Sequence, residues 1–212
     1  IGEAICFADE AGFDKVVADM RALTEIIQTE NPGIPLFLFG HSMGSMLTRR
    51  YIQLYGDDLV GAVLSGSGVF SNGLLKLGTV VAASEIKRNG RAHPSLLLDK
   101  LVFQNFNRGF KPARTDLDWL SRDEAEVDKF LKDPLRGKIG SAGYFHDFFC
   151  GLLAMNDAAN IQSIPKDLPL HFISGTADLV GGKGGKGIVQ TCRAYQQVGL
   201  QDVSYKLYEG AR

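Results

Sequence analysis

The sequence has no long apolar run, few cysteines and no excess of one charge. Its 212 residues contain three cysteines, which lie far apart and form no C-x-x-C pair: Cys6, Cys150 and Cys192. This pattern argues against a disulfide framework or a zinc site, and it predicts reduced, mostly buried thiols in a cytoplasmic protein. No apolar run approaches the ~18 residues that a membrane span needs.

Acidic and basic residues nearly cancel, with 23 Lys and Arg against 24 Asp and Glu. A nucleic-acid partner is therefore not expected, because nucleic-acid-binding surfaces carry an excess of positive charge. Hydrophobic residues make up 45% of the chain and charged residues 22%, close to globular averages. The length suits one domain, or one domain with an inserted lobe.

Compact apolar runs alternate with helical patterns at both ends of the chain. Apolar residues at a spacing of three and four predict helices, and short apolar runs bounded by Pro or Gly predict buried strands. The alternation is typical of a parallel sheet covered by helices. The predicted strands are residues 35–39, 59–64, 170–174 and 203–208, and the predicted helices are residues 12–29, 43–55 and 187–197.

This alternation stops between residues 70 and 164. The interval is rich in aromatic residues, mainly helical in pattern and without a strong strand. So long an interval indicates an inserted lobe rather than a loop. We therefore predict an α/β core, formed by residues 1–69 and 165–212, that is interrupted by a helical cap, residues 70–164.

Gly40-His41-Ser42-Met43-Gly44 is the only G-x-S-x-G motif in the chain, and it lies between a predicted strand and a predicted helix. A nucleophile elbow requires this context, which makes an ordinary glycine-flanked turn the weaker interpretation. Ser42 is predicted to be the nucleophile, and the backbone N–H of Met43 to donate to the oxyanion. Gly40 and Gly44 are expected to allow strand and helix to pack closely.

A serine nucleophile needs a base, and the base needs an orienting carboxylate. Asp178 directly follows a predicted strand and would lie at the same sheet edge as Ser42, although loop aspartates are common; Asp157 and Asp167 follow no strand. The base should be a histidine after the last strand, residues 203–208. We assign this role to none of the four histidines, which are His41, His93, His146 and His171.

Four segments together resemble the monoacylglycerol lipase and lysophospholipase group of the α/β-hydrolases. They are Gly40-His41-Ser42-Met43-Gly44, Asp178 with its glycine-rich sequel, Tyr208-Glu209-Gly210-Ala211-Arg212 and Phe110-Lys111-Pro112-Ala113-Arg114-Thr115-Asp116. The resemblance implies an α/β-hydrolase fold with a helical cap, carboxylic ester hydrolysis without metal or organic cofactor, Ser42 as nucleophile and Asp178 as the triad acid.

Two features of that group have no counterpart in the chain: the triad histidine, and the His-Gly-type loop that supplies a second oxyanion donor. The chain begins with Ile1 rather than Met and shows no signal-peptide pattern. We therefore expect that the sequence is a fragment. The early strands would precede it, and the histidine would follow shortly after Arg212.

The helical stripe Phe145, Phe148, Phe149, Leu152 and Leu153 is interpreted either as core or as the lining of an acyl-chain pocket. A loose basic group suggests a solvated face or transient contact with a membrane surface; its members are Lys76, Lys87, Arg88 and Arg91. The glycine-rich run 181–187 lacks the spacing of a phosphate-binding loop and is expected to form a turn.

The favoured function is hydrolysis of a lipid ester, an acylglycerol or a lysophospholipid, through an acyl-Ser42 intermediate. A peptidase similar to proline iminopeptidase is the alternative among enzymes. A non-catalytic binding protein of the same fold is the alternative from another class. The oligomeric state is not indicated.

Overall fold

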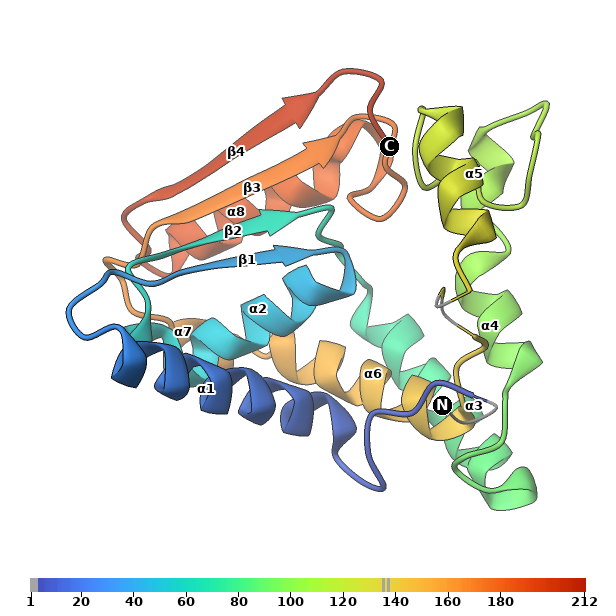
Figure 1. Ribbon diagram of the computed structural model, residues 1–212, viewed down its shortest axis with the longest axis horizontal. Coiled ribbons are helices and arrows are strands. Elements are labelled where there is room, and N and C mark those ends of the chain that lie inside the picture. Colours follow the sequence, from blue (N-terminus) through green and yellow to red (C-terminus); the bar gives the residue numbers. More distant parts are fainter. Residues whose placement is uncertain (1–3, 135, 137) are drawn as a thin grey trace.

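The computed structural model describes residues 4–134, 136 and 138–212. Four parallel strands form one sheet in the order β1-β2-β3-β4 (Figure 1). The strands are β1 Phe37–His41, β2 Gly61–Ser65, β3 Leu170–Gly175 and β4 Val203–Tyr208. The parallel sheet is confirmed, and all four strands end at the edge that faces the lobe in Figure 1.

The helices fall into two groups. Helices α1, α2, α6, α7 and α8 lie beside the sheet, whereas α3, α4 and α5 extend beyond the ends of its strands (Figure 1). Their bounds are α1 Gly12–Glu30, α2 Met43–Tyr55, α3 Asn72–Asn89, α4 Leu96–Phe103, α5 Glu124–Lys132, α6 Ala142–Met155, α7 Ala158–Gln162 and α8 Lys186–Gln197. The predicted helices coincide with α1, α2 and α8 to within one residue.

Two predicted strands are displaced by one or two residues. The strand predicted at residues 35–39 is β1, which pairs with β2 from Phe37 to His41 and so reaches the Ser42 turn. Its last residue is set by hydrogen bonds to β2 and not by where the apolar run ends. Before the second, a 3₁₀ turn, Gly56–Asp58, delays pairing until Gly61. The strand bounds inferred from apolar runs were therefore wrong at these two places.

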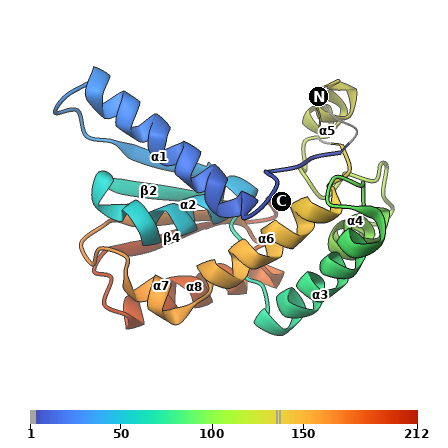
Figure 2. The ribbon, with the colours of Figure 1, turned by 90° about the horizontal axis from the view of Figure 1, so that it is seen from below.

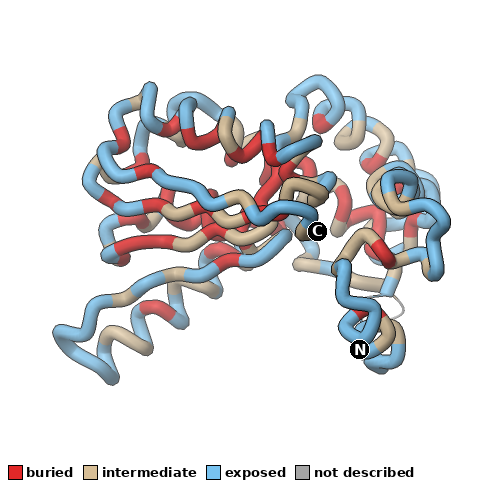
Figure 3. The backbone as a smooth tube through the Cα atoms, turned by 90° about the horizontal axis from the view of Figure 1, so that it is seen from above, coloured by how far each residue is buried: buried red, intermediate tan, exposed pale blue. Residues whose placement is uncertain are grey.

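The sheet is covered on one face. Alternate side chains on that face are buried, among them Leu64, Leu170 and Phe172. The side chains of Phe37 and Phe39 are 65% and 62% exposed, because no helix in the described part of the chain packs on their side of β1. The prediction of a fully buried first strand is wrong for these residues. Buried positions concentrate in the sheet and the helices that cover it (Figure 3).

Helices α3 and α6 form the stalk of the lobe and lie side by side (Figure 2). A Cβ at Gly78 of α3 would come within 2.8 Å of the Phe149 ring, which shows how closely the two helices pack. Helix α6 also packs against α1 and α2. The second half of the predicted cap thus lies against the core, and the cap boundaries, residues 70–164, stay a prediction.

Backbone hydrogen bonds close the base of the outer lobe. The Ser95 amide donates to the Gly140 carbonyl at 3.0 Å, and the Ala142 amide donates to the His93 carbonyl at 2.9 Å. The outer lobe, residues 96–139, therefore begins and ends at one place on the stalk.

A buried carboxylate joins α6 to two other segments. The side chain of Asp147 is 4% exposed, and its Oδ2 accepts hydrogen bonds from the Gly12 amide at 2.9 Å and from Arg91 at 2.7 Å. The carboxylate thus lies at the start of α1, where the helix dipole favours negative charge. Arg91 is therefore engaged with Asp147 and does not belong to a freely solvated basic group.

The three cysteines are free. The prediction that most are buried is wrong, because only Cys192 is buried and Cys6 and Cys150 are exposed. Among the described residues, no helix combines the length and the apolar character that a membrane crossing requires.

Candidate active site

Ser42 occupies a strained turn between β1 and α2. Its φ of 51° and ψ of −121° lie in a region that non-glycine residues rarely adopt. The turn is held by the Ser42 amide, which donates to the Ser65 carbonyl at 2.8 Å, and by the Ser45 amide, which donates to the Ser42 carbonyl at 2.9 Å. These bonds keep the exposed Ser42 side chain at the sheet edge, as a nucleophile elbow requires.

The two elbow glycines have different surroundings. A Cβ at Gly40 would overlap the Thr48 hydroxyl and lie 2.5 Å from the Gly44 carbonyl oxygen, so strand and helix could not approach as they do. A Cβ at Gly44 would meet no described heavy atom within 4 Å. Close packing therefore explains Gly40, and the role expected of Gly44 stays a prediction.

Met43 is the first residue of α2, so its backbone N–H has no partner within the helix. The positive end of the helix dipole lies at the same place. The Met43 side chain is held from α6, because the Tyr144 hydroxyl donates to its Sδ at 3.3 Å. Burial, with a smaller effect of Asp99, raises the pKa of Tyr144 to about 12, so this hydroxyl stays protonated even at alkaline pH.

Asp178 lies in the loop after β3. Its Oδ1 accepts a hydrogen bond from the Val180 amide at 2.9 Å, and its Oδ2 accepts one from the Ser174 hydroxyl at 3.4 Å. The carboxylate lines one pocket together with Ser42. The structure therefore brings the predicted nucleophile and the predicted acid to the same site.

The glycine-rich run after Asp178 forms a turn, as expected. Gly182, Gly184 and Gly185 have φ values of 79°, 67° and 70°, which favour glycine over other residues. The Gly187 amide closes the turn on the Gly181 carbonyl at 3.0 Å, directly at the start of α8.

The lobe and the loop after β4 complete the pocket. Trp119 and Leu120 line it from the lobe, and Ala211 and Arg212 line it from the loop. The neighbouring segment 110–116 carries part of the resemblance, but Trp119 and Leu120 were not predicted as site residues. The available signal was that Trp119 is the single tryptophan of the chain, close to the segment that carries the resemblance.

The histidines of the chain are not arranged as a base for Ser42. His41 lines the pocket, but its Nδ1 lies 3.1 Å from the Ser65 hydroxyl. His146 pairs with Asp147 and His171 with Ser204, both outside the pocket. Within the described ranges, no hydrogen bond joins the Ser42 hydroxyl to a histidine.

The proposed acyl-pocket residues lie in the hydrophobic core. The side chains of Phe145, Phe149 and Leu152 are 1%, 8% and 0% exposed, and Phe148 is partly buried against the same cluster. None of the four lines the pocket that contains Ser42 and Asp178. Packing is the role seen here, and a role in acyl binding stays a prediction. Likewise, the described residues contain no cluster of three metal-ligating side chains.

Comparison with known proteins places this geometry in a family. Monoglyceride lipases of Mus musculus and Homo sapiens are 27% and 28% identical to the chain over 213 aligned positions, which cover 99% of the chain and 60% of each lipase. The chain thus spans about 60% of the length of these curated relatives. A carboxyl esterase of Bacillus coagulans, solved with glycerol, is 27% identical and superposes with a TM-score of 0.86, over 94% of this chain and 64% of the esterase. Residues 7–212 match the family described as serine aminopeptidase, S33. The chain therefore belongs to the serine aminopeptidase S33 family and has the α/β-hydrolase fold.

Proposed function

We propose that the protein is a serine hydrolase that cleaves carboxylic esters of lipids through an acyl-Ser42 intermediate. The observation that carries this proposal is the strained Ser42 turn, which opens into a pocket shared with Asp178. The monoglyceride lipase relatives and the esterase with the same fold favour an ester substrate.

The reaction would proceed in two steps. The Ser42 hydroxyl attacks the ester carbonyl as its proton passes to a base, and the Met43 N–H donates to the oxyanion that forms. The tetrahedral intermediate collapses, the base returns the proton to the departing alkoxide, and an acyl ester on Ser42 remains. Water, deprotonated by the same base, then attacks the acyl carbonyl, and the base returns the proton to the Ser42 oxygen as the acid is released. Asp178 would orient the base, whose predicted position after β4 stays a prediction.

The lining of the pocket supports an ester with an apolar acyl group. Trp119, Leu120, Ile173 and Val180 contribute apolar side chains beside Ser42 and Asp178. Acylglycerols and lysophospholipids both combine such a group with a polar alcohol. The family description leaves a peptidase as the alternative enzyme.

Exposed apolar residues on the lobe support transient contact with an anionic lipid surface. Leu74, Leu77 and Val80 of α3 are 71%, 60% and 67% exposed. Lys76 lies between the first two in sequence, which adds positive charge for lipid headgroups. Co-sedimentation with vesicles should therefore be stronger for anionic than for neutral lipid, and Leu77→Ser should weaken it. Equal sedimentation of both vesicle types would contradict this contact.

The hydrolase proposal is tested by fluorophosphonate labelling of the full-length protein followed by peptide mapping. The label should lie on Ser42 and be lost in Ser42→Ala, while Ser65→Ala, which removes another hydroxyl of the pocket, should keep it. Labelling that survives Ser42→Ala would contradict the assignment.

Substrate panels then separate the remaining alternatives. Turnover of p-nitrophenyl esters should exceed turnover of aminoacyl p-nitroanilides if the protein is an esterase. The opposite preference would favour a peptidase, and absence of both labelling and turnover would favour a binding protein.

A further inference from the structure

Trp119 and Leu120 form the part of the pocket that comes from the lobe, and we call these two residues the pocket wall. They face the site from a loop between the 3₁₀ turn Phe106–Gly109 and α5. Loops are usually mobile, so a wall that discriminates between substrates must be held in place by specific contacts.

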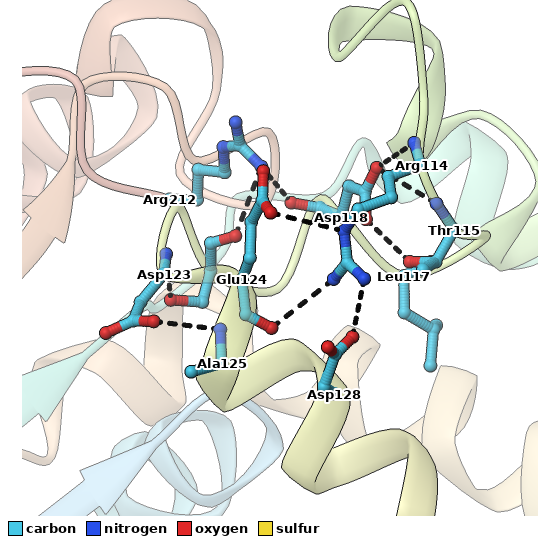
Figure 4. A network of polar contacts seen from close by, with 10 residues as sticks. Arg114, Thr115, Leu117, Asp118, Asp123, Glu124, Ala125, Asp128 and Arg212 are labelled. Carbon is cyan, nitrogen blue, oxygen red and sulfur yellow. Dashed lines mark hydrogen bonds and ion pairs between the residues drawn. The ribbon is translucent and has the colours of Figure 1, made fainter.

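Asp118 organises this loop from within. Its carboxylate is 8% exposed and accepts hydrogen bonds from the Arg114 amide at 2.5 Å, from the Thr115 amide at 3.1 Å and from the Thr115 hydroxyl at 2.6 Å (Figure 4). These bonds lower the pKa of Asp118, and the bond from the Thr115 hydroxyl has the largest effect. The carboxylate therefore stays ionised and fixes the turn that precedes the wall.

Asn107 and two phenylalanines hold Trp119 itself. The Trp119 amide donates to Asn107 Oδ1 at 3.1 Å, and Asn107 Nδ2 donates to the Thr115 carbonyl at 2.6 Å. The indole ring lies 4.8 Å from the Phe106 ring and 6.4 Å from the Phe103 ring, between centroids. The ring is thus supported on its lobe side.

Arg212 fastens the loop to the core. Its NH1 donates to the Asp118 carbonyl and, at 3.1 Å, to the Ser121 carbonyl, so its two acceptors bracket the pocket wall (Figure 4). The guanidinium also lies 4.2 Å from the centroid of the Phe110 ring. Arg122 makes the reciprocal contact, donating to the Glu209 carbonyl at 3.1 Å.

The residue before Arg212 is itself tied to the acid loop. The Ala177 amide donates to the Ala211 carbonyl at 3.0 Å, next to Asp178 in sequence. A Cβ at Gly175 would overlap that same carbonyl, so the loop after β4 rests directly on the end of β3. One short segment therefore contacts both the acid loop and the pocket wall.

We propose that Arg212 is a positioning residue that holds Trp119 and Leu120 against the catalytic site, and that this wall selects esters by the length of their apolar acyl group. The selection rests on the proposed hydrolase function, whereas the positioning of Trp119 does not. Arginine suits this role because Nη1 donates to both carbonyls while the planar guanidinium stacks on the Phe110 ring, and a lysine ammonium has no planar face to stack.

The test uses the full-length protein and two readouts. The first is the emission of Trp119, isolated by subtracting the emission of a Trp119→Phe protein, together with its quenching by acrylamide. The second is the ratio of kcat/KM for an octanoate ester to that for an acetate ester. Arg193→Ala, which removes an exposed arginine of α8, is the matched control.

In Arg212→Ala, the emission should shift to longer wavelength, quenching should increase, and the ratio should fall about tenfold or more, because the contacts of one methylene are already worth about tenfold. Arg212→Lys should behave like Arg212→Ala, although it keeps the charge and perturbs the loop less. In a Trp119→Ala background, Arg212→Ala should not change the ratio further, because the wall is already absent. Arg193→Ala should leave both readouts unchanged.

Unchanged emission in Arg212→Ala overturns the positioning role, whether or not the protein hydrolyses esters. Shifted emission with an unchanged ratio overturns the selection by acyl length. Full rescue of both readouts by Arg212→Lys overturns the role of the guanidinium in positioning the wall. Shifted emission in a protein that hydrolyses none of the esters supports the positioning of Trp119 and overturns the hydrolase function instead.

Discussion

The buried carboxylate of Asp147 should be worth more to stability than an exposed carboxylate with a similar arginine partner. Asp147→Asn keeps an oxygen that can accept from the Gly12 amide, but it removes the negative charge beside Arg91 and at the start of α1. Removing one partner of a buried ion pair costs about 3–5 kcal/mol. Arg91 is 30% exposed, so water replaces part of the lost interaction, and we expect a loss of about 2–3 kcal/mol.

Asp14, in the first turn of α1, provides the matched control. It pairs with Arg50 at 3.0 and 3.2 Å, but its side chain is 47% exposed. Arg50 is buried, but the Asp14 carboxylate is half-exposed to water, and Arg50 keeps its hydrogen bond to Gln53 after the substitution. Asp14→Asn should therefore cost about 1 kcal/mol.

Urea unfolding of the full-length variants, followed by circular dichroism, measures both losses. The two substitutions are chemically identical, so a difference between them reports the burial of the carboxylate. Equal losses, or a larger loss in Asp14→Asn, would refute the reasoning.

Three further predictions concern the elbow, the thiols and the stripe on α6. Gly40→Ala should destabilise the protein by about 1–3 kcal/mol and reduce fluorophosphonate labelling. Gly44→Ala should be neutral, or stabilise its helix by up to about 1 kcal/mol. Urea unfolding and labelling distinguish the two variants, and equal effects would contradict the close packing at Gly40. Burial raises the pKa of Cys192 to about 11, so at pH 8 only about one Cys192 thiol in a thousand is ionised. Peptide mapping after iodoacetamide treatment should therefore find the exposed Cys6 alkylated well before Cys192. The opposite order would contradict the burial of Cys192. Phe149→Ala should cost about 3–5 kcal/mol and lower the turnover of short and long esters alike, and a selective loss on long esters would instead restore the acyl-pocket role.

Local pattern was sufficient for the elements that position the site. Residues 203–208 form a strand as predicted, and the G-x-S-x-G motif lies at the junction of β1 and α2. Both features are set by residues close together in sequence: the periodicity of apolar residues and the glycines of the turn. The parallel order of the strands followed from the alternation of helix and strand, since short links leave few other topologies.

The sequence could not decide between two meanings of the same apolar stripe. Phe145, Phe149 and Leu152 recur at helical spacing whether they face a core or a ligand, and only the position of α6 against α1, α2 and α3 shows which partner they have. The pocket wall was missed for a related reason. Trp119 is positioned through contacts of Arg212 with carbonyls more than 90 residues away in sequence, and no local pattern reports such contacts.

The closed base of the outer lobe bears on how proteins of this shape diversify. The Ser95–Gly140 and His93–Ala142 backbone bonds keep the two ends of residues 96–139 together, whatever the segment between them contains. The entropic cost of closing a chain segment between two fixed ends grows only slowly with the length of the segment. Recombination between related genes at these two points would therefore exchange the whole outer lobe in one event. A descendant could acquire a different substrate range while inheriting the serine turn and the sheet without change.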